Sequence, residues 1–181
     1  MKALFLQISD IHWHASHSKE APRFPKVGQG LPSHFVNAID VVFFLYGGDL
    51  AYSGKAEEYD ELWGLLRELQ ESVKTAFGTS VQYHSIGVPG NHDCDFGHDQ
   101  SARDSLLQSV SREKGPQLQG AITDILLKPQ EAFFEFLDVL TNGSRDKLWA
   151  GVDSRLTWKH VFDLQDDLLE VNCFNTAWMS R

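Results

Sequence analysis

Cysteine is scarce in this sequence, with only Cys94 and Cys173 in a chain of 181 residues. So few cysteines exclude a disulfide framework and suit a reducing compartment. Long apolar runs are also missing. The apolar run nearest the N-terminus, residues 3–8, is too short for the core of a signal peptide or for a membrane span. We therefore expect a cytoplasmic protein that has no membrane partner.

Basic residues are fewer than acidic ones. The chain has 16 Lys and Arg and 25 Asp and Glu, which gives a formal net charge of −9. This balance argues against a surface that coats nucleic acid. It leaves a nuclease open, because bound divalent cations reverse the local charge of a site. Low-complexity stretches, internal repeats and linkers are absent as well. A single domain over residues 1–181 is therefore expected.

Three apolar runs have the length and composition of buried strands. Two further segments carry apolar residues every three or four positions, which predicts helices. The strands are expected at 3–8, 41–46 and 81–88, and the helices at 57–77 and 131–140. Strand and helix thus alternate along the chain, and such alternation is typical of α/β layering.

The remaining segments give weaker signals. Two strand-like runs, 155–164 and 168–174, are separated by a short polar turn and predict a β-hairpin. Proline and glycine interrupt residues 14–32, which predicts a long surface loop. A short helix is expected over 33–39, and one or two irregular helices are expected within 94–130.

Metal-binding residue types follow each of the three predicted strands. They are Asp10 and His12 after the first strand, Asp49 after the second, and Asn91, His92 and Asp93 after the third. Taken singly, each group is more often an ordinary turn than a ligand set. Together they would meet at one edge of the sheet, where α/β folds place their chemistry. Carboxylate, amide and imidazole ligands suit Mn, Fe, Zn or Mg, and the lack of a cysteine among them disfavours structural zinc.

These groups resemble the first three motifs of the calcineurin-like metallophosphoesterase superfamily, as Asp10-x-His12, Gly48-Asp49 and Gly90-Asn91-His92-Asp93. The segments around the second and third motifs, 48–54 and 88–94, are similar to the phosphodiesterase-type branch. The protein phosphatase branch has Gly-Asp-x-x-Asp-Arg-Gly and Gly-Asn-His-Glu instead. The resemblance implies an α/β (α+β) fold, a layered β-sandwich flanked by helices.

The resemblance also implies the metal ligands. Asp10 and His12 would bind a first ion, Asp49 would bridge two ions through its two oxygens, and Asn91 would bind the second ion. Two divalent ions are therefore expected as cofactors, manganese first, with iron, zinc, magnesium, nickel or cobalt as alternatives. Such a pair, about 3.5–4 Å apart, holds a bridging hydroxide that attacks phosphorus in line.

The third motif would supply the catalytic groups. His92 would stabilise the phosphoryl oxygens or protonate the leaving group, Asp93 would orient His92, and Asn91 would share in substrate binding. The implied reaction is hydrolysis of phosphate esters, phosphodiesters most of all. Phosphorylated small molecules or nucleotides are the expected substrates, and nucleic acid stays open although the net charge does not indicate it.

The family pattern also has a later histidine and a Gly-His-x-His motif, and none of the eight histidines here lies in such a motif. We therefore expect a domain that is incomplete at its C-terminus, with further domains after Arg181 and low activity for residues 1–181 alone. The alternative is a non-catalytic or regulatory metal-binding module of a larger multidomain protein.

For several other residues, the sequence allows both a structural role and a role in the site. His160 fits a plain strand residue better than a metal ligand, and His14 fits a loop residue better than a ligand. Trp13 is expected beside the site, where it is a candidate contact for a substrate base or sugar. Tyr52 either lines the pocket or forms a turn. Cys94 is expected to be inert.

Overall fold

A three-stranded parallel sheet forms the centre of the fold. The computed structural model describes residues 1–14, 26–31, 39–97, 100–112, 120–141, 155–164 and 167–180. The strands β1 (Ala3–Ile8), β2 (Val41–Tyr46) and β3 (Gln82–Gly87) lie in the order β1-β2-β3. The middle strand β2 is almost entirely buried, which explains its unbroken apolar sequence. All three predicted strands are confirmed, and their parallel direction brings their carboxyl ends to one edge.

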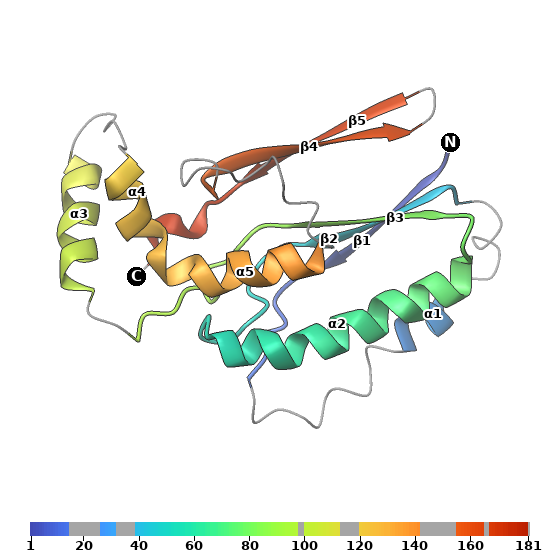
Figure 1. Cartoon of the computed structure of the whole chain (residues 1–181), viewed down its shortest axis with the longest axis horizontal. Helices are drawn as coiled ribbons and strands as arrows, with labels where there is room; N and C mark the ends of the chain where they lie inside the picture. The colour runs from blue at the N-terminus through green and yellow to red at the C-terminus, as the bar shows by residue number, and fades with distance from the viewer. Residues whose placement is uncertain are drawn as a thin grey trace.

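Two helices, α2 (Ala56–Phe77) and α5 (Glu131–Leu140), cover one face of the sheet (Figure 1). Gln70 of α2 reaches this face, where its amide donates to the hydroxyl oxygens of Tyr46 (2.9 Å) and Ser85 (3.1 Å). These bonds satisfy polar groups that are otherwise enclosed by apolar residues. Both predicted helices are confirmed, and α2 begins one residue earlier than predicted.

A short helix, α1 (Val27–Gly30), packs against α2 (Figure 1). The N–H of Gly28 donates to Ser72 Oγ at 3.0 Å. The loop predicted over 14–32 is therefore wrong at these residues. One turn of helix with two glycines has no periodicity to reveal it, and its contact with α2 stabilises it. The helix predicted over 33–39 lies outside the described residues, apart from its last position.

A β-hairpin covers the opposite face of the sheet. Its strands, β4 (Thr157–Leu164) and β5 (Asp167–Phe174), pair antiparallel as predicted. Phe162 of β4 packs on Phe43 of β2, with 5.0 Å between the ring centroids. His160 is buried on the same side of β4 and stacks on Phe162, so its interpretation as a strand residue is confirmed. The predicted α/β layering is thus present, with the sheet between helices and hairpin.

Further helices lie beyond the carboxyl ends of the strands (Figure 1). They are α3 (Ser101–Arg112), α4 (Gly120–Leu127) and two single turns, η4 (Lys128–Gln130) and η6 (Ala177–Met179). The buried Arg103 of α3 ties them together by donating to the carbonyl oxygens of Leu126 (3.2 Å) and Trp178 (2.9 Å). The helices predicted within 94–130 are confirmed. Within the described ranges, no helix is long and apolar enough to cross a bilayer.

Candidate metal centre

The loops that follow β1 and β2 run side by side beyond the sheet. The Asp10 N–H donates to the carbonyl oxygen of Gly48 (3.1 Å), and the His12 N–H donates to that of Asp49 (3.0 Å). The parallel pairing of the strands thus continues into their loops. As a result, residues from two distant motifs become direct neighbours at the carboxyl edge of the sheet.

Asp10, His12 and Asp49 form a compact group of ligand atoms. One carboxylate oxygen from each aspartate and one imidazole nitrogen all lie within 4.8 Å of one another. Ligands that share an ion at bond lengths of about 2.0–2.2 Å are at most about 4 Å apart. A small adjustment of the side chains would therefore close these three groups on one ion. The fold thus brings together the predicted ligands of the first two motifs.

The backbone of the same three residues is strained. The φ angle is 55° at Asp10, 49° at His12 and 53° at Asp49, and no other non-glycine residue in the described part of the chain has a positive φ. Side chains enter this left-handed region at a cost, which Asp, Asn and His tolerate better than other residues. Such strain collects at functional sites, where surrounding contacts maintain it. Backbone geometry therefore marks these residues independently of their side-chain chemistry.

Two glycines let the third loop close against the second. Gly48 has a φ of 89°, and a Cβ there would lie only 2.5 Å from the nitrogen of Gly90. A Cβ on Gly90 would overlap the Asp49 carboxylate. Because neither side chain exists, the His92 N–H reaches Asp49 Oδ1 and donates to it at 2.8 Å. The main chain of the third motif thus holds the Asp49 carboxylate in place through this hydrogen bond.

Replacing Gly90 with alanine should disrupt the centre, because the new methyl group would occupy the space of the Asp49 carboxylate. We expect a loss of about 1–3 kcal/mol in the free energy of unfolding and metal binding weakened by about ten-fold or more. Gly64→Ala is the matched control, since an added Cβ has nothing within 4 Å there. Urea denaturation and equilibrium dialysis with Mn²⁺ measure the two effects. Unchanged metal affinity in Gly90→Ala would contradict this packing.

His92 lies against the group of three ligands. Its ring meets the ring of His12 edge to face, with centroids 4.4 Å apart. Its Nδ1 lies 2.8 Å from the carbonyl oxygen of Tyr52. Because a carbonyl oxygen only accepts, this contact assigns the hydrogen to Nδ1. Nε2 is then the ring atom available to exchange a proton with a substrate.

Asp93 is completely buried and joins the second and third loops. Its carboxylate accepts hydrogen bonds from the N–H groups of Leu50 (3.1 Å), Ala51 (3.0 Å) and Gly90 (2.9 Å). The hydroxyl of Tyr59 on α2 donates a fourth bond at 2.8 Å. Burial raises the pKa of the Asp93 carboxyl, and burial together with Asp93 raises the pKa of Tyr59. Through its four hydrogen bonds, the Asp93 carboxylate holds the second loop, the third loop and α2 together.

The role expected for Asp93 needs correction. It was expected to orient His92, but the carbonyl oxygen of Tyr52 is the group that contacts the His92 ring. The oxygens of Asp93 bond to main-chain donors and to Tyr59. Asp93 is thus a positioning residue. Helical spacing with Leu62 indicates that Tyr59 is buried, but no sequence signal gives its partner.

Asn91 is exposed between two residues that the fold fixes, Gly90 and His92. Together with Tyr52 and His92 it lines a cavity of about 460 Å³. This position is next to the three ligands, because the His92 ring contacts His12. Binding of a second ion by the Asn91 amide stays a prediction.

Residues 3–170 match a family model described as calcineurin-like phosphoesterase. This span contains all three motifs and runs from β1 into β5. The chain belongs to the calcineurin-like phosphoesterase family. The resemblance seen in the three motifs is thus confirmed. No curated protein and no solved structure matches the chain significantly.

The phosphoesterase family implies divalent metal, and the residues present suit it. Two carboxylates and one imidazole are donors for a hard to borderline divalent ion. The strained backbone and the bond from His92 to Asp49 hold these donors in place. Within the described ranges, Asp10, His12 and Asp49 are the one group of three such ligands. They provide for one ion, and Asp49 with Asn91 are the candidates for a second.

Trp13 belongs to the core of this domain. Its side chain is 5% exposed, and its indole Nε1 donates to the Glu61 carboxylate at 3.1 Å. Its main chain forms a parallel bridge with Ala51, which extends the pairing of the first two loops. A substrate contact was the candidate role for Trp13, and the burial of its side chain speaks against that role.

Cys94 is buried just beyond the third motif. Burial raises the pKa of its thiol to about 11, so the sulfur stays protonated and inert, as expected from the sequence. The amide of Gln130 lies 3.5 Å from Cys94 Sγ, and its carbonyl accepts a bond from Asn175 Nδ2 at 2.7 Å. This bridge connects the site loop, η4 and the end of β5.

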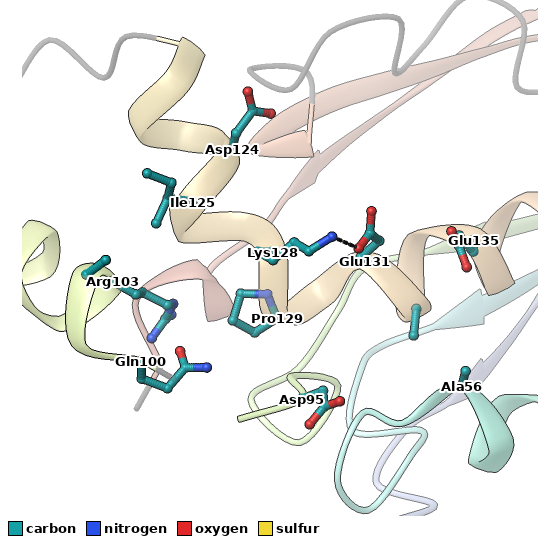
Figure 2. Close-up of a pocket in the computed structure, with 12 residues that line it drawn as sticks. Ala56, Asp95, Gln100, Arg103, Asp124, Ile125, Lys128, Pro129, Glu131 and Glu135 are labelled. Atoms are coloured by element: carbon teal, nitrogen blue, oxygen red, sulfur yellow. Dashed lines mark hydrogen bonds and ion pairs between the residues drawn. The ribbon is translucent and has the colours of Figure 1, made fainter. Parts of the chain in front are cut away.

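A second cavity, of about 500 Å³, is lined by residues of α3, α4, η4 and α5 (Figure 2), and none of Asp10, His12 and Asp49 lines it. Four carboxylates line it: Asp95, Asp124, Glu131 and Glu135. The ammonium group of Lys128 is already paired with Glu131 (Figure 2). Because the four carboxylates outnumber the two cations of the lining, Arg103 and Lys128, a phosphate ester fits the metal centre better than this cavity.

Proposed function

We propose that this domain hydrolyses phosphate esters, with a preference for phosphodiesters, and that it does so with divalent ions held by Asp10, His12, Asp49 and Asn91. The observation that carries the proposal is the group of three ligands on strained backbone at the carboxyl edge of the sheet. Membership of the calcineurin-like phosphoesterase family supports the reaction class.

Each side chain has a distinct task in this proposal. Bound divalent ions would supply Lewis acidity at phosphorus and a water of lowered pKa. Asp10, His12 and Asp49 would hold the ions, and the hydrogen bond from the His92 N–H keeps the Asp49 carboxylate in position. The Tyr52 carbonyl fixes the His92 ring, so that Nε2 can pass a proton to the leaving oxygen.

The preference for diesters rests on charge and on sequence. A diester carries one negative charge, whereas a monoester carries close to two at neutral pH. Ser53 stands where the protein phosphatase pattern has arginine, and its hydroxyl is bound to Glu58 at 3.0 Å. Lys55 is the one cation among the residues that line the cavity at His92. With so little cationic charge beside the metal ligands, a singly charged ester is the better fit.

A direct assay tests the proposal. Protein stripped with EDTA and reloaded with Mn²⁺ should hydrolyse bis-p-nitrophenyl phosphate, and the stripped protein should not. We expect p-nitrophenyl phosphate, the monoester, to be turned over at least about ten-fold more slowly, since one power of ten corresponds to about 1.4 kcal/mol of barrier. Release of p-nitrophenol measures both rates. Bound manganese without hydrolysis of either ester would overturn the proposal.

That last outcome would favour a second candidate function, a metal-binding module without turnover. One observation speaks for it. The described residues bring together three possible ligands, which suffice for one ion. A single-ion module would retain tight metal binding, and adding a phosphodiester would produce no p-nitrophenol.

A further inference from the structure

The cavity beside His92 has lining residues, apart from Asn91 and His92, to which the proposed reaction gives no task. It measures about 460 Å³, within the range of small-molecule sites. It joins the metal centre through His92, whose ring contacts His12. The lining residues are Tyr52, Ser53, Lys55, Asn91, His92, Cys94, Asp95, Phe96 and Gly97. A phosphate ester whose phosphoryl group sits at the three ligands would extend its organic group into this space.

Tyr52 is a large aromatic side chain that is kept half exposed beside the site. It is 50% exposed, although its main chain is fixed at both ends, by an N–H bond to Trp13 (2.9 Å) and by the carbonyl contact with His92 (2.8 Å). Its ring is flanked by two imidazoles, with centroids 5.4 Å from His14 and 5.8 Å from His92. These neighbours hold the ring at the mouth of the cavity, where a flat partner can contact it.

Phe96 brings a second aromatic ring to the same cavity. The guanidinium of Arg103 lies 5.3 Å from the centroid of the Phe96 ring. Arg103 is itself buried and bound to two carbonyl oxygens, so it holds Phe96 in place. The cavity therefore presents two fixed aromatic side chains, and it differs in this from the carboxylate-lined cavity at α4.

We propose that this cavity is the subsite for the organic group of the ester, and that Tyr52 makes it selective for a planar aromatic group. The inference rests on the proposed function, because it needs the phosphoryl group at the metal ligands. Aromatic rings in contact prefer stacked or edge-to-face packing, which a methyl or other small alkyl group cannot provide. Tyr52 is thus a specificity-determining residue, whereas Trp13 is too deeply buried to be one.

Binding of two phosphonates tests the metal centre and the cavity separately. Phosphonates are suitable ligands because their P–C bond is not hydrolysed. Phenylphosphonate and methylphosphonate carry the same charged group, and only the first has a ring for the cavity. Calorimetric titration of the manganese-loaded protein should give an affinity ratio of about five-fold to ten-fold in favour of phenylphosphonate, the amount that one aromatic contact contributes. In Tyr52→Ala we expect the ratio to fall to about one.

Three further variants complete the test. Tyr52→Phe keeps the ring and should keep the ratio, and Tyr52→Leu keeps bulk without aromaticity and should lose it. Phe174→Ala is the matched control, because Phe174 is also exposed (61%) but lies on β5. Binding of methylphosphonate shows in each variant that the metal centre is intact.

The outcomes distinguish the two proposals. An unchanged ratio in Tyr52→Ala and Tyr52→Leu would overturn the role of Tyr52 and leave the phosphoesterase proposal standing. Equal affinity of the unsubstituted protein for both phosphonates would overturn the aromatic subsite. If neither phosphonate binds in a manganese-dependent way, the proposed function fails and this inference fails with it.

Discussion

Replacing Asp49 with asparagine should remove the bound metal and the phosphodiesterase activity together. Asparagine tolerates the left-handed φ of 53° at this position and keeps a carbonyl oxygen that can accept the His92 N–H. The fold should therefore persist, and the change is the loss of one negative charge and one ligand oxygen. We expect metal affinity to fall at least about a hundred-fold, since even changes to groups behind metal ligands often reach that size.

Metal content after desalting, measured by mass spectrometry, and turnover of bis-p-nitrophenyl phosphate check this expectation. Asp60→Asn is a suitable control, because it makes the same chemical change at an exposed position of α2. Circular dichroism should show the same secondary structure in both variants. Full metal occupancy with unchanged turnover in Asp49→Asn would exclude Asp49 as a ligand.

Replacing Asp93 with alanine should destabilise the domain strongly, although Asp93 is not expected to touch the substrate. The change leaves the N–H groups of Leu50, Ala51 and Gly90 and the hydroxyl of Tyr59 without their acceptor. Each buried donor that loses its partner costs about 1–3 kcal/mol, so we expect a total of about 3–5 kcal/mol after partial rearrangement.

Urea denaturation followed by tryptophan fluorescence measures this loss. Asp163→Ala is the control, because Asp163 lies on the exposed side of β4 and should change stability by about 0.5 kcal/mol or less. Asp93→Asn keeps one acceptor oxygen and should fall between the two. If Asp93→Ala unfolds at the same urea concentration as Asp163→Ala, the carboxylate does not hold the loops together.

Much of the fold follows from periodicity. The strand β2 is a continuous apolar run because both of its faces are covered, and α2 shows its buried side in the spacing of Leu62, Leu66 and Leu69. The hairpin follows from two strand-like runs around a polar turn. That Asp10, His12 and Asp49 lie close together was predictable for a different reason, since each has a metal-binding side chain and directly follows a predicted strand.

The remainder depends on main-chain geometry and on contacts between distant segments. The positive φ angles of the three ligands have no signature in the sequence, and neither has the carbonyl oxygen that holds His92. The partners of Asp93 are mostly backbone N–H groups, which every residue except proline carries. The helix α1 was missed because its stability comes from α2 and not from its own residues.

The bridge from Cys94 through Gln130 to Asn175 bears on the order in which the chain folds. Its members come from the loop after β3, from η4 and from the segment directly after β5. Contacts between parts so distant in sequence form slowly, because a long stretch of chain must first be ordered. In refolding, helix would thus appear before the loop of the third motif is fixed. Uptake of metal would then report the finished domain and not an early collapsed state.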